Sequence, residues 1–156
     1  MLTTQSADGA CVMPVPGHIG DDRYLKMKLT KAQREAVKAK FGGRCAYCGC
    51  ELGDRWHADH FEAVVRNMRW ESGKGFVPTG TLLRPQHDTI DNMMPACAPC
   101  NIDKGSNSLE WWRGKLQGAV DVLARNSPTF RHALRFNLII ENPVPVTFYF
   151  ERQLRR

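Results

Sequence analysis

The sequence predicts a small domain of mixed α+β class, and three observations support that prediction. The chain has 156 residues, 42% hydrophobic and 24% charged, which suits one folded domain with arms and argues against a wholly disordered chain. Apolar residues recur at helical spacing over 30–41 and 108–125, whereas 55–65 and 144–150 resemble strands. Four of the six cysteines form two close pairs, which indicates that a cross-link organises the centre of the domain.

The N-terminal part is predicted to be an irregular arm followed by a helix. Residues 1–29 are rich in Gly, Pro and Asp and show no clear period. Thr30 is predicted to start the helix, because Gln33 lies three residues later and completes a capping box. Gly42 and Gly43 tolerate positive φ and are predicted to end it. The apolar stripe of this helix consists of Ala32, Ala36, Val37 and Phe41.

The middle of the chain is predicted to contain strand segments separated by a long loop. Residues 55–65 form the strand region, and residues 93–94 form the entry to the second cysteine pair. Residues 66–91 contain several Gly and Pro and are long for a hairpin connection, so we predict a loop. Long ordered loops are often functional.

Residues 98–125 are predicted to form two helices. The first covers residues 98–104 and stops at Gly105. Asn107 and Glu110 resemble a cap and its reciprocal acid, which predicts a longer helix over about 108–125. Its buried face would contain Leu109, Trp112, Leu116, Ala119 or Val120, and Leu123.

The C-terminal extension, residues 127–156, is predicted to contain one short helix and a pair of short strands. Ser127–Pro128 starts the helix, since Pro is tolerated at the first helical position. Residues 138–140 and 144–150 form the strands, and Pro143 and Pro145 would confine at least part of that pair to a sheet edge. The preceding core then covers residues 30–126.

Two Cys-x-x-Cys pairs predict a structural zinc site. Such turns aim two thiolates at one point, and two of them give the four sulfur ligands of a tetrahedral site. The alternative is a redox pair, which the absence of a βαβ pattern around either motif disfavours. Cys11 and Cys50 are interpreted as plain thiols, although Cys50 is near enough to compete as a ligand. The predicted zinc ligands are Cys45, Cys48, Cys97 and Cys100.

The charge balance favours a polyanionic partner. Lys and Arg number 22 against 16 Asp and Glu, which gives a net charge of +6 and a pI near 9.2. No apolar run approaches the roughly 18 residues of a membrane span, and residues 1–10 lack the features of a secretory signal. We therefore expect a cytoplasmic protein in a reducing compartment, with no membrane partner.

One constellation of residues carries the candidate chemistry. Asp59–His60 lies between the cysteine pairs, and Asn92 lies nine residues before Asn101. The second pair continues as Cys-x-x-Cys-Asn-x-x-Lys-Gly, ending at Gly105. Together these motifs, over about residues 45–105, resemble the HNH endonuclease family, in the form that has Asn as the last motif residue. The resemblance implies a ββα-metal, treble-clef-like core held by the four-cysteine zinc, with flanking helices.

The resemblance also implies a role for each motif residue. His60 would be the general base that deprotonates the attacking water. Asp59 and Asn101 would hold one catalytic Mg²⁺ or Mn²⁺, while Asn92 would brace the loop and orient His60. Lys104 matches a basic residue of the family and would meet a phosphate. Oxygen ligands suit Mg²⁺ or Mn²⁺, whereas sulfur ligands select zinc, so the two sites would bind different metals.

Three points about this site stay open at the level of sequence. Neighbouring residues of a regular strand face opposite sides, so Asp59 and His60 share one site only if the strand ends or bends there, or if they approach the phosphate from two sides. His57 is either a third metal ligand or, as we prefer, solvent-facing. Asn92 is either the loop brace or only a cap for the second cysteine turn.

Basic and aromatic residues around the site suggest DNA contacts. Arg66, Arg69 and Lys74 would bind the DNA backbone, with Trp70 stacking; the alternative is an ordinary solvated loop whose Trp70 packs on the domain. Trp111 falls off the helical stripe and is a candidate for an interface. Residues 125–156 hold six Arg against two Glu, which either follow phosphates or keep an edge strand soluble.

The main functional hypothesis is a metal-dependent DNA endonuclease that nicks as a monomer. One ββα unit has one cleavage centre, so a double-strand cut would need a homodimer or two encounters. The alternative from another class is a zinc-stapled nucleic-acid-binding module without catalysis. A structure-selective or RNA-directed nuclease with the same site is a third hypothesis.

Overall fold

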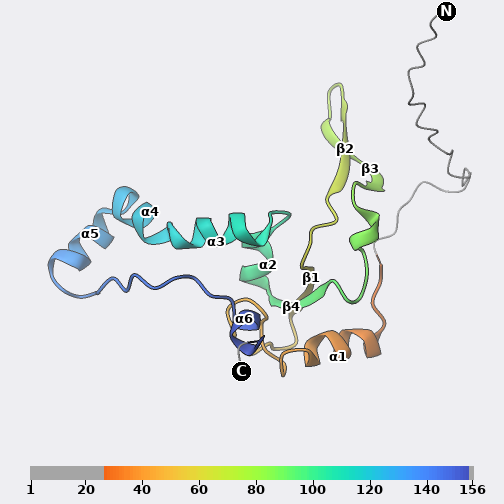
Figure 1. Cartoon of the computed structure of the whole chain (residues 1–156). Helices are drawn as coiled ribbons and strands as arrows, with labels where there is room; N and C mark the ends of the chain where they lie inside the picture. The colour runs from red at the N-terminus through yellow and green to blue at the C-terminus, as the bar shows by residue number, and fades with distance from the viewer. Residues whose placement is uncertain (1–26, 155–156) are drawn as a thin grey trace, which may run out of the picture.

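The computed structural model describes residues 27–154, so most of the predicted arm, including Cys11, lies outside the described residues. The fold is mixed α+β, as predicted (Figure 1). Its elements in chain order are α1 (Lys31–Ala39), β1 (Trp56–His60), β2 (Arg66–Glu71), β3 (Gly75–Leu82), the 3₁₀ turn η1 (Pro85–His87), β4 (Met93–Cys97), α2 (Ala98–Lys104), α3 (Leu109–Gln117), α4 (Ala119–Asn126), α5 (Pro128–Arg135) and α6 (Tyr149–Leu154).

Strands β1 and β4 form an antiparallel pair that leads directly into α2. The register places Trp56 opposite Cys97 and His60 opposite Met93. Because β4 ends at Cys97 and α2 begins at the next residue, two strands and a helix pack as one unit. Gly105 ends α2, as the sequence predicted. This unit carries every motif residue between Asp59 and Lys104 except Asn92, which immediately precedes β4.

The predicted loop over 66–91 is instead largely a β-hairpin. Strands β2 and β3 pair antiparallel, with Trp70 opposite Phe76 and Met68 opposite Pro78. Gly and Pro misled the prediction, but both strands of a two-stranded ribbon are edge strands, where Pro is tolerated. Figure 1 shows the hairpin extending from the β1 end of the molecule, with its tip away from the helices. The loop reading was therefore wrong for most of this segment.

Helix α1 begins as predicted but is buried less evenly than its stripe suggested. The Thr30 hydroxyl accepts a hydrogen bond from the Gln33 amide, and the Gln33 side chain accepts one from the Thr30 amide, which completes the capping box. Val37 is fully buried, whereas Ala32 and Ala36 are exposed. One residue therefore carries most of the burial along this helix.

The predicted helix over 108–125 is two helices with a break at Gly118. Ser108, not Asn107, is the N-cap of α3 and accepts a hydrogen bond from the Trp111 amide. Asn107 instead donates from its amide to the Lys104 carbonyl at the end of α2. Trp112 is buried, but Val120 and Leu123 are exposed on α4. The packed face therefore ends within α3.

The C-terminal strand pair was predicted wrongly. Within the described chain, residues 136–148 contain no strand, and α6 covers part of the second predicted strand. The helix at Ser127–Pro128 was predicted correctly, with the Ser127 hydroxyl accepting from the Phe130 amide. The chain then returns to the core, where the Tyr149 and Phe150 amides donate to backbone carbonyls of 46–47 (Figure 1). The backbone hydrogen bonds that a strand pair would have supplied are made with the first cysteine turn.

The hydrophobic core joins the first cysteine turn, β4, α3 and the returning C-terminal segment. Trp112 stacks on Phe148 with centroids 5.1 Å apart, and Tyr47 meets both rings edge-on. The Trp112 indole also donates to Asp103 on α2. The buried apolar residues are Val37, Cys45, Ala46, Tyr47, Leu52, Trp56, Met93, Met94, Ala96, Trp112, Phe148 and Phe150.

Phe148→Ala should destabilise the fold, because it removes the ring that Trp112 and Tyr47 contact. Truncation of a buried Phe costs about 3–5 kcal/mol in free energy of unfolding. Phe136→Ala is the matched control, since Phe136 is exposed and surface changes usually stay within about 0.5 kcal/mol. Urea unfolding of both variants measures the difference. Equal midpoints would show that the C-terminal segment does not belong to the core.

Candidate metal centres and active site

The four predicted zinc ligands form one cluster. Their sulfur atoms all lie within 4.8 Å of one another, and Cys48 and Cys97 are 3.8 Å apart. A tetrahedral zinc with Zn–S bonds of about 2.3 Å requires S–S separations of about 3.8 Å, so the donor set fits a structural zinc. Cys45 and Cys48 come from the turn after α1, Cys97 from the end of β4 and Cys100 from the first turn of α2.

Hydrogen bonding between the thiols already favours a thiolate at one position. The Cys100 thiol hydrogen-bonds with Cys45, which is the main reason that the pKa of Cys45 is lowered to about 4. Cys50 is exposed and lies outside the four-cysteine set, but its thiol hydrogen-bonds with Cys48 and Cys97, so it is near enough to compete as a ligand. Its backbone carbonyl accepts a hydrogen bond from the Cys45 amide.

Asp59 is held by two buried donors. The Tyr47 hydroxyl donates to Asp59 Oδ2 at 2.5 Å, and Lys104 Nζ lies 2.9 Å from the same oxygen. Burial and the Asp59 charge raise the pKa of Tyr47 far above its usual range, so Tyr47 stays a neutral donor. Both contacts hold the carboxylate in one orientation.

Lys104 lies in the interior rather than on a DNA-facing surface. Its side chain is fully buried, and Nζ also donates to the His60 carbonyl oxygen at 2.7 Å. The expected phosphate contact therefore does not fit this position. Lys104 instead connects α2 to the last two residues of β1. An unpaired charge in the interior would destabilise the folded state. The ion pair with Asp59 therefore explains how the Lys104 ammonium can be buried.

His60 makes a contact that the sequence did not reveal. Its Nε2 lies 2.7 Å from Asp88 Oδ1, and both side chains are buried. Asp88 Oδ2 also accepts a hydrogen bond from the Met27 amide, which fixes the carboxylate. An ionised carboxylate can only accept, so a neutral imidazole paired with it would carry its proton on Nε2 and its lone pair on Nδ1. Asp88 lies 28 residues after His60, and no motif spacing connects the two.

Asn92 braces the segment that follows β1. Its side-chain oxygen accepts from the Glu62 amide, and its side-chain nitrogen donates to the carbonyls of Glu62 and His87. Its backbone carbonyl accepts from the Phe61 amide. These partners lie next to His60 and Asp88, not in the second cysteine turn. The bracing role, rather than the turn cap, fits this geometry.

The side chains of Asn101 and His57 contact each other in the candidate metal site. His57 is exposed, as preferred from the sequence, and its Nδ1 lies 2.8 Å from Asn101 Nδ2. The end of the Asn101 amide able to bind a cation is its oxygen. His57, Asp59, His60 and Asn101 all line one recess of about 520 Å³.

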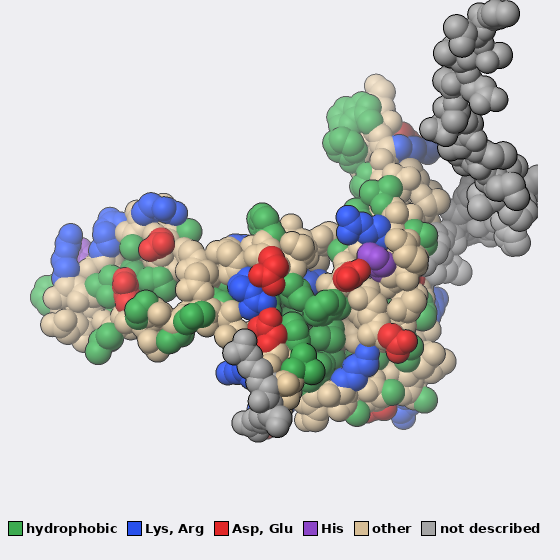
Figure 2. Space-filling view, viewed as in Figure 1, with side chains coloured by type: hydrophobic (Ala, Val, Ile, Leu, Met, Phe, Trp, Pro, Cys, Tyr) green, Lys and Arg blue, Asp and Glu red, His purple; other side chains and the backbone are tan. Residues whose placement is uncertain are grey.

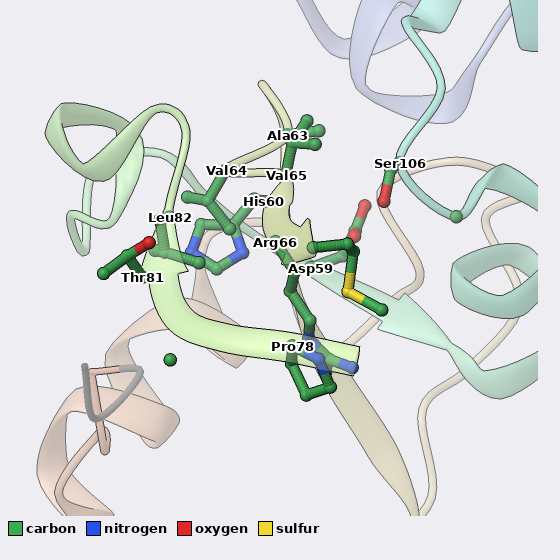
Figure 3. Close-up of a pocket in the computed structure, with 13 residues that line it drawn as sticks. Asp59, His60, Ala63, Val64, Val65, Arg66, Pro78, Thr81, Leu82 and Ser106 are labelled. Atoms are coloured by element: carbon green, nitrogen blue, oxygen red, sulfur yellow. The ribbon is translucent and has the colours of Figure 1, made fainter. Parts of the chain in front are cut away.

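Asp59 and His60 also line a second, larger cleft, which lies beside the hairpin. His60 is the last residue of β1, so the strict alternation of the strand ends there and both residues face shared space. The cleft has a volume of about 710 Å³ and is lined further by Arg66, Pro78 and Ser106, among others (Figure 3). The structure therefore brings Arg66 to the site.

The remaining predicted DNA contacts lie farther along the hairpin. Arg69 and Lys74 both form ion pairs with Glu71, at 2.5 and 2.9 Å. Trp70 is exposed near the tip, and Trp111 is exposed on α3. Figure 2 shows Lys and Arg gathered over α4 and α5 as well, which locates part of the basic C-terminal charge away from the cleft.

No family model, curated protein or solved structure matches this chain. Within residues 27–154, no helix is both long enough and apolar enough to cross a membrane.

Proposed function

We propose that this chain is a metal-dependent DNA endonuclease of HNH type that hydrolyses phosphodiester bonds. The observation that carries the proposal is the contact between His60 and Asp88 at a recess that Asp59 and Asn101 also line. A buried histidine with an oriented ring, next to two oxygen donors, is the arrangement that water activation beside a cation requires. The order β1, β4, α2 and the four-cysteine cluster support the ββα-metal core that the motifs imply.

His60 acts as the general base through Nδ1. Asp88 keeps the proton on Nε2, which leaves the Nδ1 lone pair for a proton of the attacking water. As His60 gains that proton, the imidazolium is stabilised by the adjacent Asp88 carboxylate, in the way that a carboxylate orients histidine in hydrolytic triads. Asn92 holds the backbone on both sides of this pair.

Asp59 and Asn101 would hold Mg²⁺ or Mn²⁺ through the Asp59 oxygen that faces away from Lys104 and through the Asn101 amide oxygen. Bound there, the cation supplies electrostatic stabilisation of the developing charge on the leaving oxygen. Lys104 and Tyr47 orient Asp59, and the Lys104 charge reduces the attraction of that carboxylate for a cation. We therefore expect weak metal binding that depends on the DNA phosphate as a further ligand.

The structural zinc and the basic residues complete the proposed enzyme. Cys45, Cys48, Cys97 and Cys100 would hold the zinc, and a bound ion would connect the first cysteine turn to β4 and to α2, the helix that carries Asn101. Arg66, at the edge of the cleft, is positioned to meet a phosphate. With one such centre among residues 27–154, a monomer nicks one strand, and a homodimer would be needed for paired cuts.

Conversion of supercoiled plasmid to nicked circle tests the proposal. We expect nicking with added Mg²⁺ or Mn²⁺ and none when only the structural zinc is present. Linear, single-stranded and branched DNA in parallel reactions separate the nuclease classes. Absence of cutting with Mg²⁺, Mn²⁺, Ni²⁺ and Zn²⁺ on all of these substrates would contradict it.

One observation favours a second candidate, a zinc-stapled nucleic-acid-binding module without catalysis. The Lys104 ammonium already neutralises the carboxylate that would hold the catalytic cation. Tight DNA binding without cutting in the same experiment would select this candidate. A non-catalytic binding module does not explain why His60 and Asp88 form an oriented buried pair, so we rank this candidate second.

Asp88→Asn should lower the cleavage rate about 10²- to 10⁴-fold with little change in DNA affinity. The amide can donate to Nε2, which favours the tautomer whose lone pair points away from the water. Asp91→Asn is the control, since Asp91 is exposed and three residues away. Single-turnover rates and binding constants of both variants measure the effect. An unchanged rate for Asp88→Asn would remove Asp88 from the mechanism.

A further inference from the structure

We propose that one face of the β2–β3 hairpin is a stacking surface for unpaired bases, so that the preferred substrate carries a single-stranded or unstacked segment beside the scissile phosphate. This inference rests on the proposed nuclease function and names its substrate class.

The hairpin has an apolar face made of two cross-strand pairs. Trp70 pairs with Phe76, and Met68 pairs with Pro78. Directly opposed residues share a face, and so do residues two apart on one strand, so all four side chains lie on the same side. Trp70 and Phe76 are 67% and 70% exposed, and Met68 is 44% exposed. Large apolar side chains are rarely gathered on a surface unless something binds them.

This face leads into the cleft at the candidate active site. Met68 and Pro78 line the same cleft as Asp59 and His60, and Figure 3 shows Pro78 beside Arg66 at its wall. From Arg66 to Trp70 is four residues, which corresponds to about 13 Å along a strand. The exposed face thus leads from the aromatic tip to the cleft that His60 also lines.

The two aromatic rings contact each other and stay largely exposed. Their centroids are 5.3 Å apart with an interplanar angle of 75°, so the pair is edge-to-face. Every nucleobase has a π-face, so exposed aromatic rings bind bases with little sequence preference. Stacking one base on such a ring changes affinity by roughly 5- to 150-fold.

The charges near the tip of the hairpin lie on its other face, whereas Arg66 lies at the cleft. Arg69 and Glu71 alternate with the stripe along β2, and Glu71 pairs with both Arg69 and Lys74. These contacts lower the pKa of Glu71, first through Lys74, so the carboxylate stays charged and neutralises its neighbours. Figure 2 shows hydrophobic side chains on one side of the hairpin and charged ones on the other. A ribbon that reads a duplex groove offers polar and basic groups to base edges and phosphates, and this face offers rings.

Binding measurements on the full chain test the proposal without cleavage. His60→Ala serves as the background, and fluorescence anisotropy compares a 5′-labelled 20-nucleotide single strand with the blunt duplex of the same sequence. We expect the single strand to bind more tightly, and Trp70→Ala with Phe76→Ala to weaken it at least about tenfold. Phe136→Ala, which removes an exposed ring at the end of α5, is the matched aromatic control and should leave both affinities unchanged.

Two further measurements keep the result interpretable. The zinc content and the melting temperature of the double variant should match those of the His60→Ala background. Trp70→Phe, made in place of Trp70→Ala, should keep most of the single-strand affinity. Unchanged single-strand binding in the double variant would overturn the proposal, as would equal loss on the duplex. Absence of any nucleic-acid binding would also overturn it and would favour a protein partner for this face. If binding depends on the aromatic pair but wild type cuts nothing, the nuclease function fails while the stacking surface stands.

Discussion

Cys97→Ser should give a protein that does not reach the native fold in zinc-containing buffer. The four sulfur atoms connect the turn after α1 with β4 and α2, and the Cys97 amide also donates to Cys45 Sγ. Structural zinc in small domains contributes about 10–16 kcal/mol of apparent binding free energy, whereas whole domains are stable by about 5–15 kcal/mol. Loss of one ligand therefore removes a contribution as large as the net stability.

The control for this experiment is Cys50→Ser, because Cys50 is exposed and lies outside the four-cysteine set. It should bind one zinc per chain and melt like wild type. Circular dichroism melts and metal analysis of purified protein measure both properties. Identical melting curves for Cys97→Ser and wild type would refute the zinc site as the organising element.

His60→Ala should abolish most of the nicking activity while the protein still folds and binds zinc. A positioned general base contributes about 10²–10⁴ to a rate, and the Asp88 carboxylate does not take its place because it lies on the Nε2 side of the ring, away from Nδ1. The variant leaves a buried carboxylate short of one partner, so we expect a loss of about 1–3 kcal/mol in stability.

His132→Ala on α5 is the matched control for His60→Ala, since it removes an imidazole outside both the recess and the cleft. Initial rates of plasmid nicking at saturating Mg²⁺ measure the difference between the two variants. Full activity in His60→Ala would remove the general base from the proposal and leave the cation alone as its catalytic element.

Features set by neighbouring residues could be predicted from the sequence, and features set by distant pairing could not. The Cys-x-x-Cys turns, the capping box at Thr30 and the stop at Gly105 depend on residues within one turn of each other, and each appears in the structure. The hairpin over 66–82 depends on which strands pair, and its Gly and Pro content concealed it.

The candidate site shows the same division. Asp59, His60 and Asn101 could be found by motif, and they do line one recess. Asp88 could not be found, because its contact with His60 depends on how η1 and β4 return the chain to β1. Lys104 was assigned to a phosphate by motif, yet its position in the three-dimensional packing makes it a buried partner of Asp59. Motifs identify residue types, and packing decides which atoms they meet.

The return of the chain at residues 148–150 has a consequence for the order of assembly during synthesis. Phe148 and Phe150 pack on Tyr47, and Tyr47 in turn donates to Asp59, so the last-made part of the described fold supports the first-made part of the site. Tyr149, between these two residues, also packs closely on the first cysteine turn: a Cβ added at Gly49 would lie 2.8 Å from the Tyr149 ring. The proposed catalytic centre therefore lacks this support until the segment has emerged from the ribosome. A chain stopped after Asn142 should melt less cooperatively than wild type, and an unchanged melt would contradict this dependence. A cell that makes such an enzyme would be protected from cutting by half-made copies.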